Sequence, residues 1–126
     1  MDLMEIAKPK IFVSYTVRDG SIGVVFLNKI FDEICGISEV YIDLIHNDST
    51  NKQDRVIKEL NNSDFIFLIR TEQIDNSEWV DKEISLAKKL NIPIIEFEYQ
   101  ELIEKKIRPI TQAINNLTLR DKTVYS

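Results

Sequence analysis

A tryptophan and a glutamate four positions apart, Trp79 and Glu83, are the residues with the clearest capacity for chemistry. They lie in a segment of helical period, where this spacing leaves two side chains about 40° apart around the helix axis. An indole and a carboxylate therefore share one face near the start of a helix. A carboxylate so placed can stabilise positive charge that builds on a sugar ring as a bond to it breaks. Alternatively, Glu83 is a solvated helix residue that pairs with Lys82, and Trp79 is a core anchor.

Polar side chains also follow the first strand-like run of the chain. Ser14 and Tyr15 end this run, and Arg18 and Asp19 come shortly after it. The guanidinium fork of Arg18 can bind a diphosphate through paired hydrogen bonds. An ordinary surface contact between Arg18 and Asp19 is the alternative.

Three more candidates stand at the ends of later runs or in the loops that follow. Asp43 either binds hydroxyl groups of a ligand or turns the loop behind it. His46, the only histidine, binds phosphate, carries a proton or does neither. Arg70 either contacts a phosphate or is simply exposed to solvent.

The length and charge of the chain limit its class. With 126 residues it has room for one domain, and we expect residues 1–9 to be an extension and residues 10–126 that domain. A net charge of −5 and a sequence pI of about 4.9 argue against a nucleic-acid partner, which needs a basic surface. No apolar run approaches the roughly 20 residues that cross a bilayer, and the N-terminus is unlike a signal peptide. The expectation is a cytoplasmic protein without a membrane partner, in which Cys35 is a buried thiol.

Apolar runs of strand length alternate with segments of helical period. The predicted strands cover residues 11–15, 40–44, 65–69 and 92–97, and the predicted helices cover residues 21–36, 50–61 and about 75–90. The run at 65–69 is apolar throughout and indicates a central strand with helices on both faces. After Phe97 we expect a short helix, a short edge strand near Ile107 and a helix around 111–116. The alternation predicts an α/β fold with a parallel sheet of four or five strands.

Capping residues and periodicity predict where the helices begin and what they bury. Gly36 is a candidate for a C-terminal glycine of positive φ, Thr50 with Gln53 for a capping box, and Asp75 or Ser77 for an N-cap. Asn91 is expected to end the third helix. The predicted inward stripes are Ile22, Val25, Phe26, Ile30 and Ile34, then Val56, Ile57 and Leu60, then Val80, Ile84, Ala87 and Leu90. Since ligands of parallel sheets bind beyond the carboxyl ends of the strands, the candidate residues are expected along that edge.

Several runs resemble the motifs of TIR domains, in the same order and spacing. They are Lys10-Ile-Phe-Val-Ser-Tyr15, Val40-Tyr-Ile-Asp43, Ser63-Asp-Phe-Ile-Phe-Leu-Ile69, and Ser77-Glu-Trp-Val-Asp-Lys-Glu-Ile84 followed by Ala87 and Ile92-Pro-Ile-Ile95. The resemblance covers about residues 10–97 and implies a flavodoxin-like, three-layer TIR domain. The short chain and the stretch from Tyr41 to His46 look most like the TIR proteins of Thoeris-type bacterial antiphage systems.

The resemblance implies an enzyme that breaks the nicotinamide–ribose bond of NAD, with Glu83 as the catalytic residue. The implied substrate-binding residues are Ser14, Tyr15, Arg18, Asp19, Asp43, His46, Arg70 and Trp79. NAD is then the substrate and not a cofactor, and no metal ion is expected. In a Thoeris-like setting the product is an ADP-ribose derivative, cyclic or conjugated, that activates a separate effector protein. Self-association to complete the site is a further implication.

Other functions stay open at this point. A non-catalytic TIR scaffold would use its loops and helices for assembly, and a nucleoside deoxyribosyltransferase-like enzyme would cleave nucleosides with the same carboxylate. No G-x-G-x-x-G motif follows the first strand, which disfavours a dinucleotide bound in the Rossmann manner. The loop after Asp43 has no glycine, so partner contacts of signalling TIR domains do not carry over to it. Hydrolysis, cyclisation and transfer to another acceptor are equally compatible with the residues.

Overall fold

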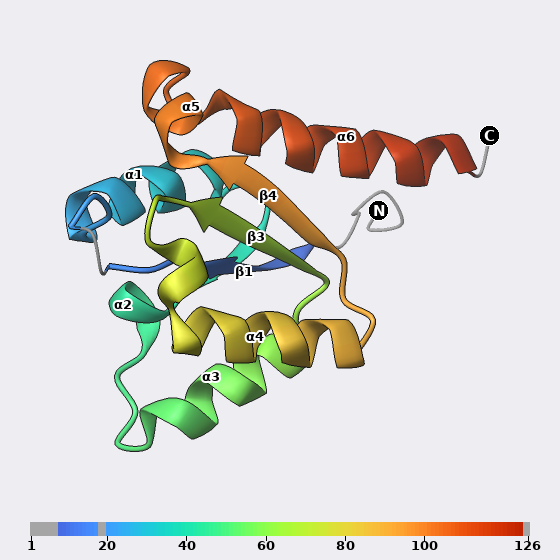
Figure 1. Cartoon of the computed structure of the whole chain (residues 1–126). Coiled ribbons are helices and arrows are strands. Elements are labelled where there is room, and N and C mark those ends of the chain that lie inside the picture. The colour runs from blue at the N-terminus through green and yellow to red at the C-terminus, as the bar shows by residue number, and fades with distance from the viewer. Residues whose placement is uncertain (1–7, 18–19, 125–126) are drawn as a thin grey trace.

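The centre of the molecule is a four-stranded sheet in which every strand runs parallel to its neighbours (Figure 1). The computed structural model describes residues 8–17 and 20–124. The strands are β1 (Lys10–Ser14), β2 (Glu39–Ile42), β3 (Phe65–Arg70) and β4 (Ile94–Glu98), in the order β2-β1-β3-β4. With helices between successive strands, this order is the flavodoxin-like topology.

Strand β3 is the central strand that its apolar sequence predicts. Residues 66–69 are buried, and the strand pairs with β1 on one side and β4 on the other. Pro93 precedes β4, which begins at Ile94, so the proline lies where its missing N–H costs no ladder bond. The predicted alternation of strands and helices is confirmed.

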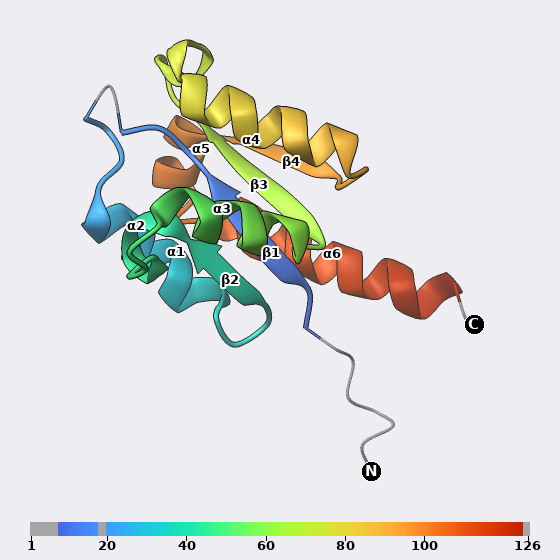
Figure 2. The ribbon, with the colours of Figure 1, turned by 90° about the horizontal axis from the view of Figure 1, so that it is seen from below.

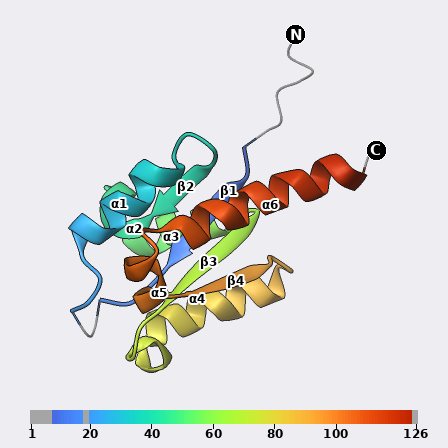
Figure 3. The same cartoon turned by 90° about the horizontal axis from the view of Figure 1, so that it is seen from above.

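Helices cover both faces of the sheet. On one face lie α1 (Val24–Ile34), α5 (Tyr99–Glu104) and α6 (Arg108–Val124), and on the other lie α3 (Lys52–Asn61) and α4 (Glu78–Lys89). Figures 2 and 3 show the α3–α4 layer from below and the α1–α5–α6 layer from above. A short helix, α2 (Asp43–His46), follows β2, and a 3-10 turn, η2 (Ile74–Asn76), precedes α4.

Side chains of β1 alternate between the two layers. Ile11 and Val13 belong to the core under α1, α5 and α6, whereas Phe12 packs in the core under α3 and α4. Because side chains of a strand alternate with a period of two, Ser14 shares the face of Phe12. The last residue of β1 is therefore directed toward α4.

The fifth strand expected near Ile107 is not found in the part of the chain that the structure describes. Lys106 and Ile107 instead adopt left-handed φ values of 52° and 67° between α5 and α6. The Ile107 side chain is buried in the core with Ile110. Burial of this apolar side chain offsets the cost of a conformation that β-branched residues rarely adopt.

Helix α1 differs from its predicted stripe. Val25 is 72% exposed, and Leu27, which the stripe omitted, is completely buried. The helix begins only at Val24, so its inward face is set by Phe26, Leu27, Ile30 and Ile34. The predicted end was also wrong, since the helix stops at Ile34 without a residue of positive φ at Gly36. Cys35 at the C-cap is exposed and is not the buried thiol that we expected.

The other helix ends follow local hydrogen bonds. Asn51, and not Thr50, caps α3, because its side chain accepts the N–H of Asp54 at 3.1 Å. Ser77 caps α4 by accepting the N–H of Val80 at 3.3 Å, and Asn91 ends that helix with a φ of 60°. The predicted inward residues Ile57 and Leu90 are exposed, while the other members of those two stripes are buried or half-buried.

Strand β2 is shorter than predicted. It ends at Ile42, and Asp43 is the first residue of α2 where a strand end and a polar loop were expected. None of the described helices is long and apolar enough to cross a membrane.

Candidate active site

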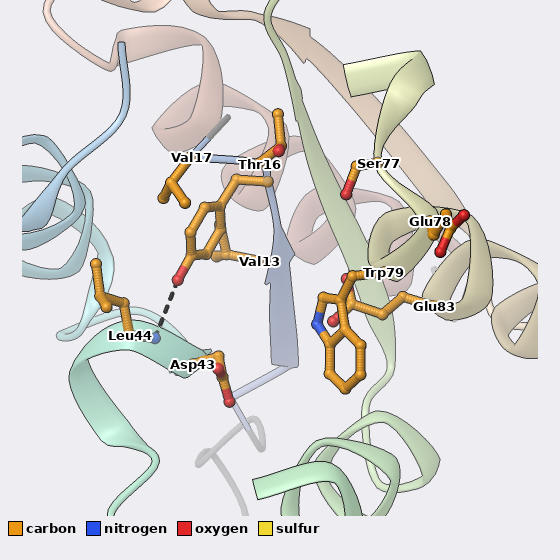
Figure 4. Close-up of a pocket in the computed structure, with 10 residues that line it drawn as sticks. Val13, Thr16, Val17, Asp43, Leu44, Ser77, Glu78, Trp79 and Glu83 are labelled. Atoms are coloured by element: carbon orange, nitrogen blue, oxygen red, sulfur yellow. Dashed lines mark hydrogen bonds between the residues drawn. The ribbon is translucent and has the colours of Figure 1, made fainter. Parts of the chain in front are cut away.

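A cavity of about 400 Å³ opens at the carboxyl ends of β1 and β2, beside the N-terminus of α4 (Figure 4). Its walls come from the end of β1, the first turn of α2 and the first turns of α4. The lining residues are Val13, Tyr15, Thr16, Val17, Asp43, Leu44, Ser77, Glu78, Trp79 and Glu83. The cavity therefore lies at the edge of the sheet where ligands of parallel α/β proteins bind.

Glu83 is a buried carboxylate in the wall of this cavity. It is only 6% exposed, and its Oε1 accepts a hydrogen bond of 2.8 Å from the hydroxyl of Ser14. The pKa of Glu83 is raised to about 7, mainly by burial and also by the nearby charge of Asp43. Hydrogen bonds from Ser14 and Trp79 act in the opposite direction. Near neutral pH, Glu83 is therefore divided between its acid and its carboxylate forms.

Trp79 lies one helical turn before Glu83 and is 36% exposed. Figure 4 shows the indole beside the carboxylate at the mouth of the cavity. The indole and Glu83 also line a smaller slot of about 130 Å³ between α3 and α4. An aromatic face exposed at this place is available to a ligand, so Trp79 is not a fully buried core anchor.

Asp43 faces Glu83 from the other side of the cavity and is held by two side chains. Its Oδ1 accepts hydrogen bonds of 2.7 Å from the Tyr41 hydroxyl and from the Asn47 amide. Asn47 is itself buried and donates a second bond, of 3.0 Å, to the carbonyl of Lys52. Asp43 thus supports its own loop, as one of the two alternatives from the sequence expects, and it also lines the cavity.

Tyr15 connects β1 to α2. Its hydroxyl oxygen accepts the N–H of Leu44 at 3.0 Å, the bond dashed in Figure 4. Burial raises the pKa of Tyr15 to about 12, and the charges of Asp43 and Glu83 raise it as well. The phenol therefore keeps its proton and can donate a hydrogen bond to a ligand in the cavity.

Three of the predicted binding residues, Ser14, His46 and Arg70, do not line the cavity. Ser14 is buried and is connected to the cavity wall by its hydrogen bond to Glu83. The Nδ1 of His46 accepts the N–H of Ile42 at 2.9 Å, and its ring contacts Phe31. Arg70 is the last residue of β3 and lies beside a different groove, where it pairs with Asp75 at 3.1 Å. Arg70 also pairs with Glu96 at 3.2 Å and approaches Glu98 at 3.9 Å. Since carboxylates already match its charge, Arg70 is not a free phosphate-binding group.

Arg18 and Asp19 lie outside the described residues. Among the described residues of the cavity wall, Asp43, Glu78 and Glu83 are acidic and none is basic. In the described part of the chain, no group of His, Cys, Asp and Glu side chains could hold a metal ion. The described walls therefore favour ligand groups that are neutral, such as hydroxyls, or positively charged, and they disfavour anions.

Six residues of the cavity wall were not among the predicted site residues. They are Val13, Thr16, Val17, Leu44, Ser77 and Glu78. Val13, Thr16 and Val17 lie at or just after the carboxyl end of β1, where ligands of parallel sheets are expected, and Ser77 and Glu78 lie at the predicted start of α4. Leu44 carries no such signal, because it reaches the cavity only through a helix turn that the sequence did not predict.

The fold and this cavity define a class: an α/β protein of flavodoxin-like topology with a buried carboxylate at the ligand edge of its sheet. A comparison with models of known protein families gives no match. A comparison with curated proteins gives none either.

Proposed function

We propose that this chain is a TIR-type enzyme that cleaves the nicotinamide–ribose bond of NAD. The observation that carries the proposal is the buried Glu83 carboxylate, held by Ser14 at 2.8 Å in the wall of a cavity at the ligand edge of the sheet. NAD as the substrate rests on the resemblance of residues 10–97 to TIR domains. Glu83 is the catalytic residue in this proposal.

The chemistry that Glu83 would support is a dissociation. As the glycosidic bond breaks, nicotinamide leaves with the bonding electron pair and its ring becomes neutral, while positive charge builds on the ribose. A carboxylate stabilises that charge more strongly in a buried site than in water. Water, a hydroxyl of the substrate or another nucleophile then forms the new bond to the ribose carbon and loses a proton. The ionised form of Glu83 is thus the active form.

The opposite wall would hold the ribose. Asp43 can accept hydrogen bonds from ribose hydroxyls, since Tyr41 and Asn47 fix its other oxygen. The Tyr15 phenol can donate to a ligand oxygen, and the Trp79 indole offers a flat surface for a ring. These roles are proposed for residues that meet around one cavity.

The diphosphate of NAD needs a cation that the described wall does not contain. Arg18 follows Val17 of the wall by one position in the sequence. We assign diphosphate binding to Arg18 in this proposal, and Arg18→Gln is expected to raise KM for NAD with a smaller effect on kcat. Asp19 is the neighbouring polar residue of the same loop.

The acidic wall also favours a second candidate function. A nucleoside carries no phosphate, so it can occupy the described cavity without repulsion from Asp43 and Glu78. A nucleoside deoxyribosyltransferase-like enzyme would use Glu83 on such a substrate. Cleavage of nucleosides in the absence of NAD turnover would favour this candidate.

In the wider proposal the product is an ADP-ribose derivative, cyclic or conjugated, that serves as a signal in antiphage defence. It would reach a separate effector protein of a Thoeris-like system, and self-association of the chain could complete the site. The assignment to defence rests on the resemblance alone.

The test is to incubate the purified chain with NAD and to identify every product by mass spectrometry. Parallel incubations contain histidine and other small nucleophiles, a phage-infected lysate, or a panel of nucleosides in place of NAD. Release of nicotinamide with an ADP-ribose derivative supports the proposal. Absence of any cleavage, under all of these conditions, would leave the non-catalytic scaffold as the function.

Glu83→Gln is the decisive variant, because it keeps the shape of the side chain and removes its charge. We expect nicotinamide release to fall by at least about 100-fold. Asp81→Asn is the matched control, since Asp81 is an exposed carboxylate on the same helix and does not line the cavity. Retained turnover in Glu83→Gln, or equal loss in the control, contradicts the assignment of Glu83.

A further inference from the structure

Helix α2 brings Asp43 and Leu44 to the cavity, yet it has only four residues. The first N–H groups of any helix have no partner within the helix and need one from elsewhere. The N-cap of α2 is Ile42, whose apolar side chain makes no capping bond. The position of this cavity wall therefore depends on groups outside the backbone of α2.

Two side chains supply the missing acceptors. The Tyr15 hydroxyl accepts the N–H of Leu44 at 3.0 Å, and Nδ1 of His46 accepts the N–H of Ile42 at 2.9 Å. The second bond runs from the N-cap backbone to a side chain four positions later. It closes the helix as the glutamate of a capping box does, with an imidazole in place of the carboxylate.

This bond requires one protonation state of His46. An imidazole nitrogen accepts a hydrogen bond only when it carries no proton, so the single proton of the neutral ring is on Nε2. The imidazolium ion carries a proton on both nitrogens and has no acceptor. Protonation of His46 and the bond from Ile42 therefore exclude each other.

The surroundings of the ring favour its neutral form. The ring packs against Phe31 of α1 and Tyr41 of β2, with centroid separations of 5.2 and 6.0 Å. The charged groups that act on it come from α3 and are Arg55 and Glu59. Burial lowers the pKa of His46, and the positive charge of Arg55 lowers it further, whereas the negative charge of Glu59 acts in the opposite direction.

We propose that neutral His46 is a latch that closes α2 and so holds Asp43 and Leu44 at the cavity, and that protonation of His46 opens this latch. In this assignment His46 is a positioning residue and not a phosphate ligand or a proton carrier. The latch is a property of the fold and can be tested without any substrate. Its effect on turnover rests on the proposed function.

NMR spectroscopy of the full chain tests the latch directly. His46 is the only histidine, so its ring nitrogens give unambiguous signals. We expect the Nε2–H tautomer at pH 7.5, and loss of protection of the Ile42 amide against hydrogen exchange as His46 takes up a proton at a pH below 6.5. An Nδ1–H tautomer, or an exchange rate of the Ile42 amide that does not change as His46 is protonated, overturns the proposal.

Two variants of His46 separate the effect of its hydrogen-bond acceptor from the effect of its positive charge. His46→Gln keeps an acceptor oxygen without a titration, and we expect the Ile42 amide to stay protected at low pH. His46→Phe removes the acceptor, and we expect exchange of that amide to be faster by on the order of tenfold at every pH. Lys58→Gln is the control, because Lys58 is an exposed charged residue of α3 that is not among the groups acting on His46. A protected Ile42 amide in His46→Phe contradicts the latch.

Turnover supplies a separate readout. If the chain cleaves NAD, His46→Phe should raise KM through the misplaced α2 wall, and His46→Gln should restore it. If no cleavage of NAD or nucleosides is found, the exchange and tautomer measurements still decide whether the latch exists. Failure of the proposed function and failure of the latch are therefore distinguishable.

Discussion

The Glu83 carboxyl is buried, and no cation pairs with it among the residues that the structure describes. A buried carboxylate without a cation is costly, because desolvation penalises its charged form. The site keeps two hydrogen-bond donors, Ser14 and Trp79, that lower this penalty but do not remove it. Such a combination is typical of a group that is placed for chemistry rather than for stability.

The first prediction concerns the cost of Glu83 in the folded chain. Its pKa is raised from 4.5 to about 7, so the stability linked to its proton is fully present below pH 4.5 and is lost as pH rises through about 7. This shift corresponds to on the order of 3 kcal/mol above pH 7. Glu83→Gln, which stays neutral, should therefore unfold at a higher temperature than the wild type at pH 8.5, with a much smaller difference at pH 5.

Thermal unfolding of both proteins across this pH range is the measurement. The lowered pKa of His46 acts in the opposite sense, since its contribution is lost as pH falls below 6.5. Both proteins contain His46, so its contribution cancels in the difference between them. A difference in unfolding temperature that does not change with pH contradicts a raised pKa of Glu83.

A second prediction concerns Ser14 as a positioning residue. Its hydroxyl stabilises the carboxylate form, so Ser14→Ala should raise the pKa of Glu83 above 7. If the ionised form is active, turnover should fall most at neutral pH and recover toward pH 9. The acidic limb of the kcat/KM profile moves to higher pH, and carboxyl NMR signals report the same shift without substrate. Ser85→Ala, at an exposed position of α4, is the control, and an equal loss at all pH values argues against this role.

At the scale of elements, the sequence was informative where structure depends on local pattern. The apolar run of β3, the alternation of strands and helices, and the Ser77 cap of α4 all follow from neighbouring residues. Helix α2 was not predicted, because it is closed by Tyr15, which is 29 positions from Leu44, and by His46. Likewise, the ion pair of Arg70 with Glu96 was not predictable, because these residues are 26 positions apart and meet only through the pairing of β3 and β4.

The turn between α5 and α6 carries a prediction at this scale. Lys106 and Ile107 both have left-handed φ values, but Lys106 is exposed and Ile107 is buried. Glycine relieves the conformational cost at either position. Lys106→Gly should therefore stabilise the chain by up to about 1 kcal/mol, whereas Ile107→Gly should destabilise it by about 3 kcal/mol through lost burial.

Urea unfolding of the two glycine variants gives both free energies. The opposite signs are the essential result, since the two positions share one backbone conformation and differ in burial. If Lys106→Gly destabilises as strongly as Ile107→Gly, then the turn is not held by the buried isoleucine. Gln112→Gly, at an exposed position inside α6, is a control that should destabilise through lost helix propensity.

For the whole molecule, the missing fifth strand leaves β4 paired with β3 alone among the described strands. An edge strand offers unpaired backbone groups to other chains, and charged side chains on it disfavour such pairing. Glu96 and Glu98 are exposed on β4, and Arg70 reaches both of them from β3. We infer that these two glutamates keep the edge of the sheet from pairing with a second copy.

The last prediction follows from this edge. Replacing Glu96 and Glu98 together by valine removes both charges and raises strand propensity. The variant should therefore self-associate more strongly than the wild type at the same protein concentration. Analytical ultracentrifugation over a concentration series measures the difference. Glu33→Val with Glu104→Val makes the same change of charge and hydropathy at exposed helical positions. If the two double variants associate equally, the loss of charge drives the association and the free edge of β4 does not. If only the β4 variant associates, the contact is at this strand.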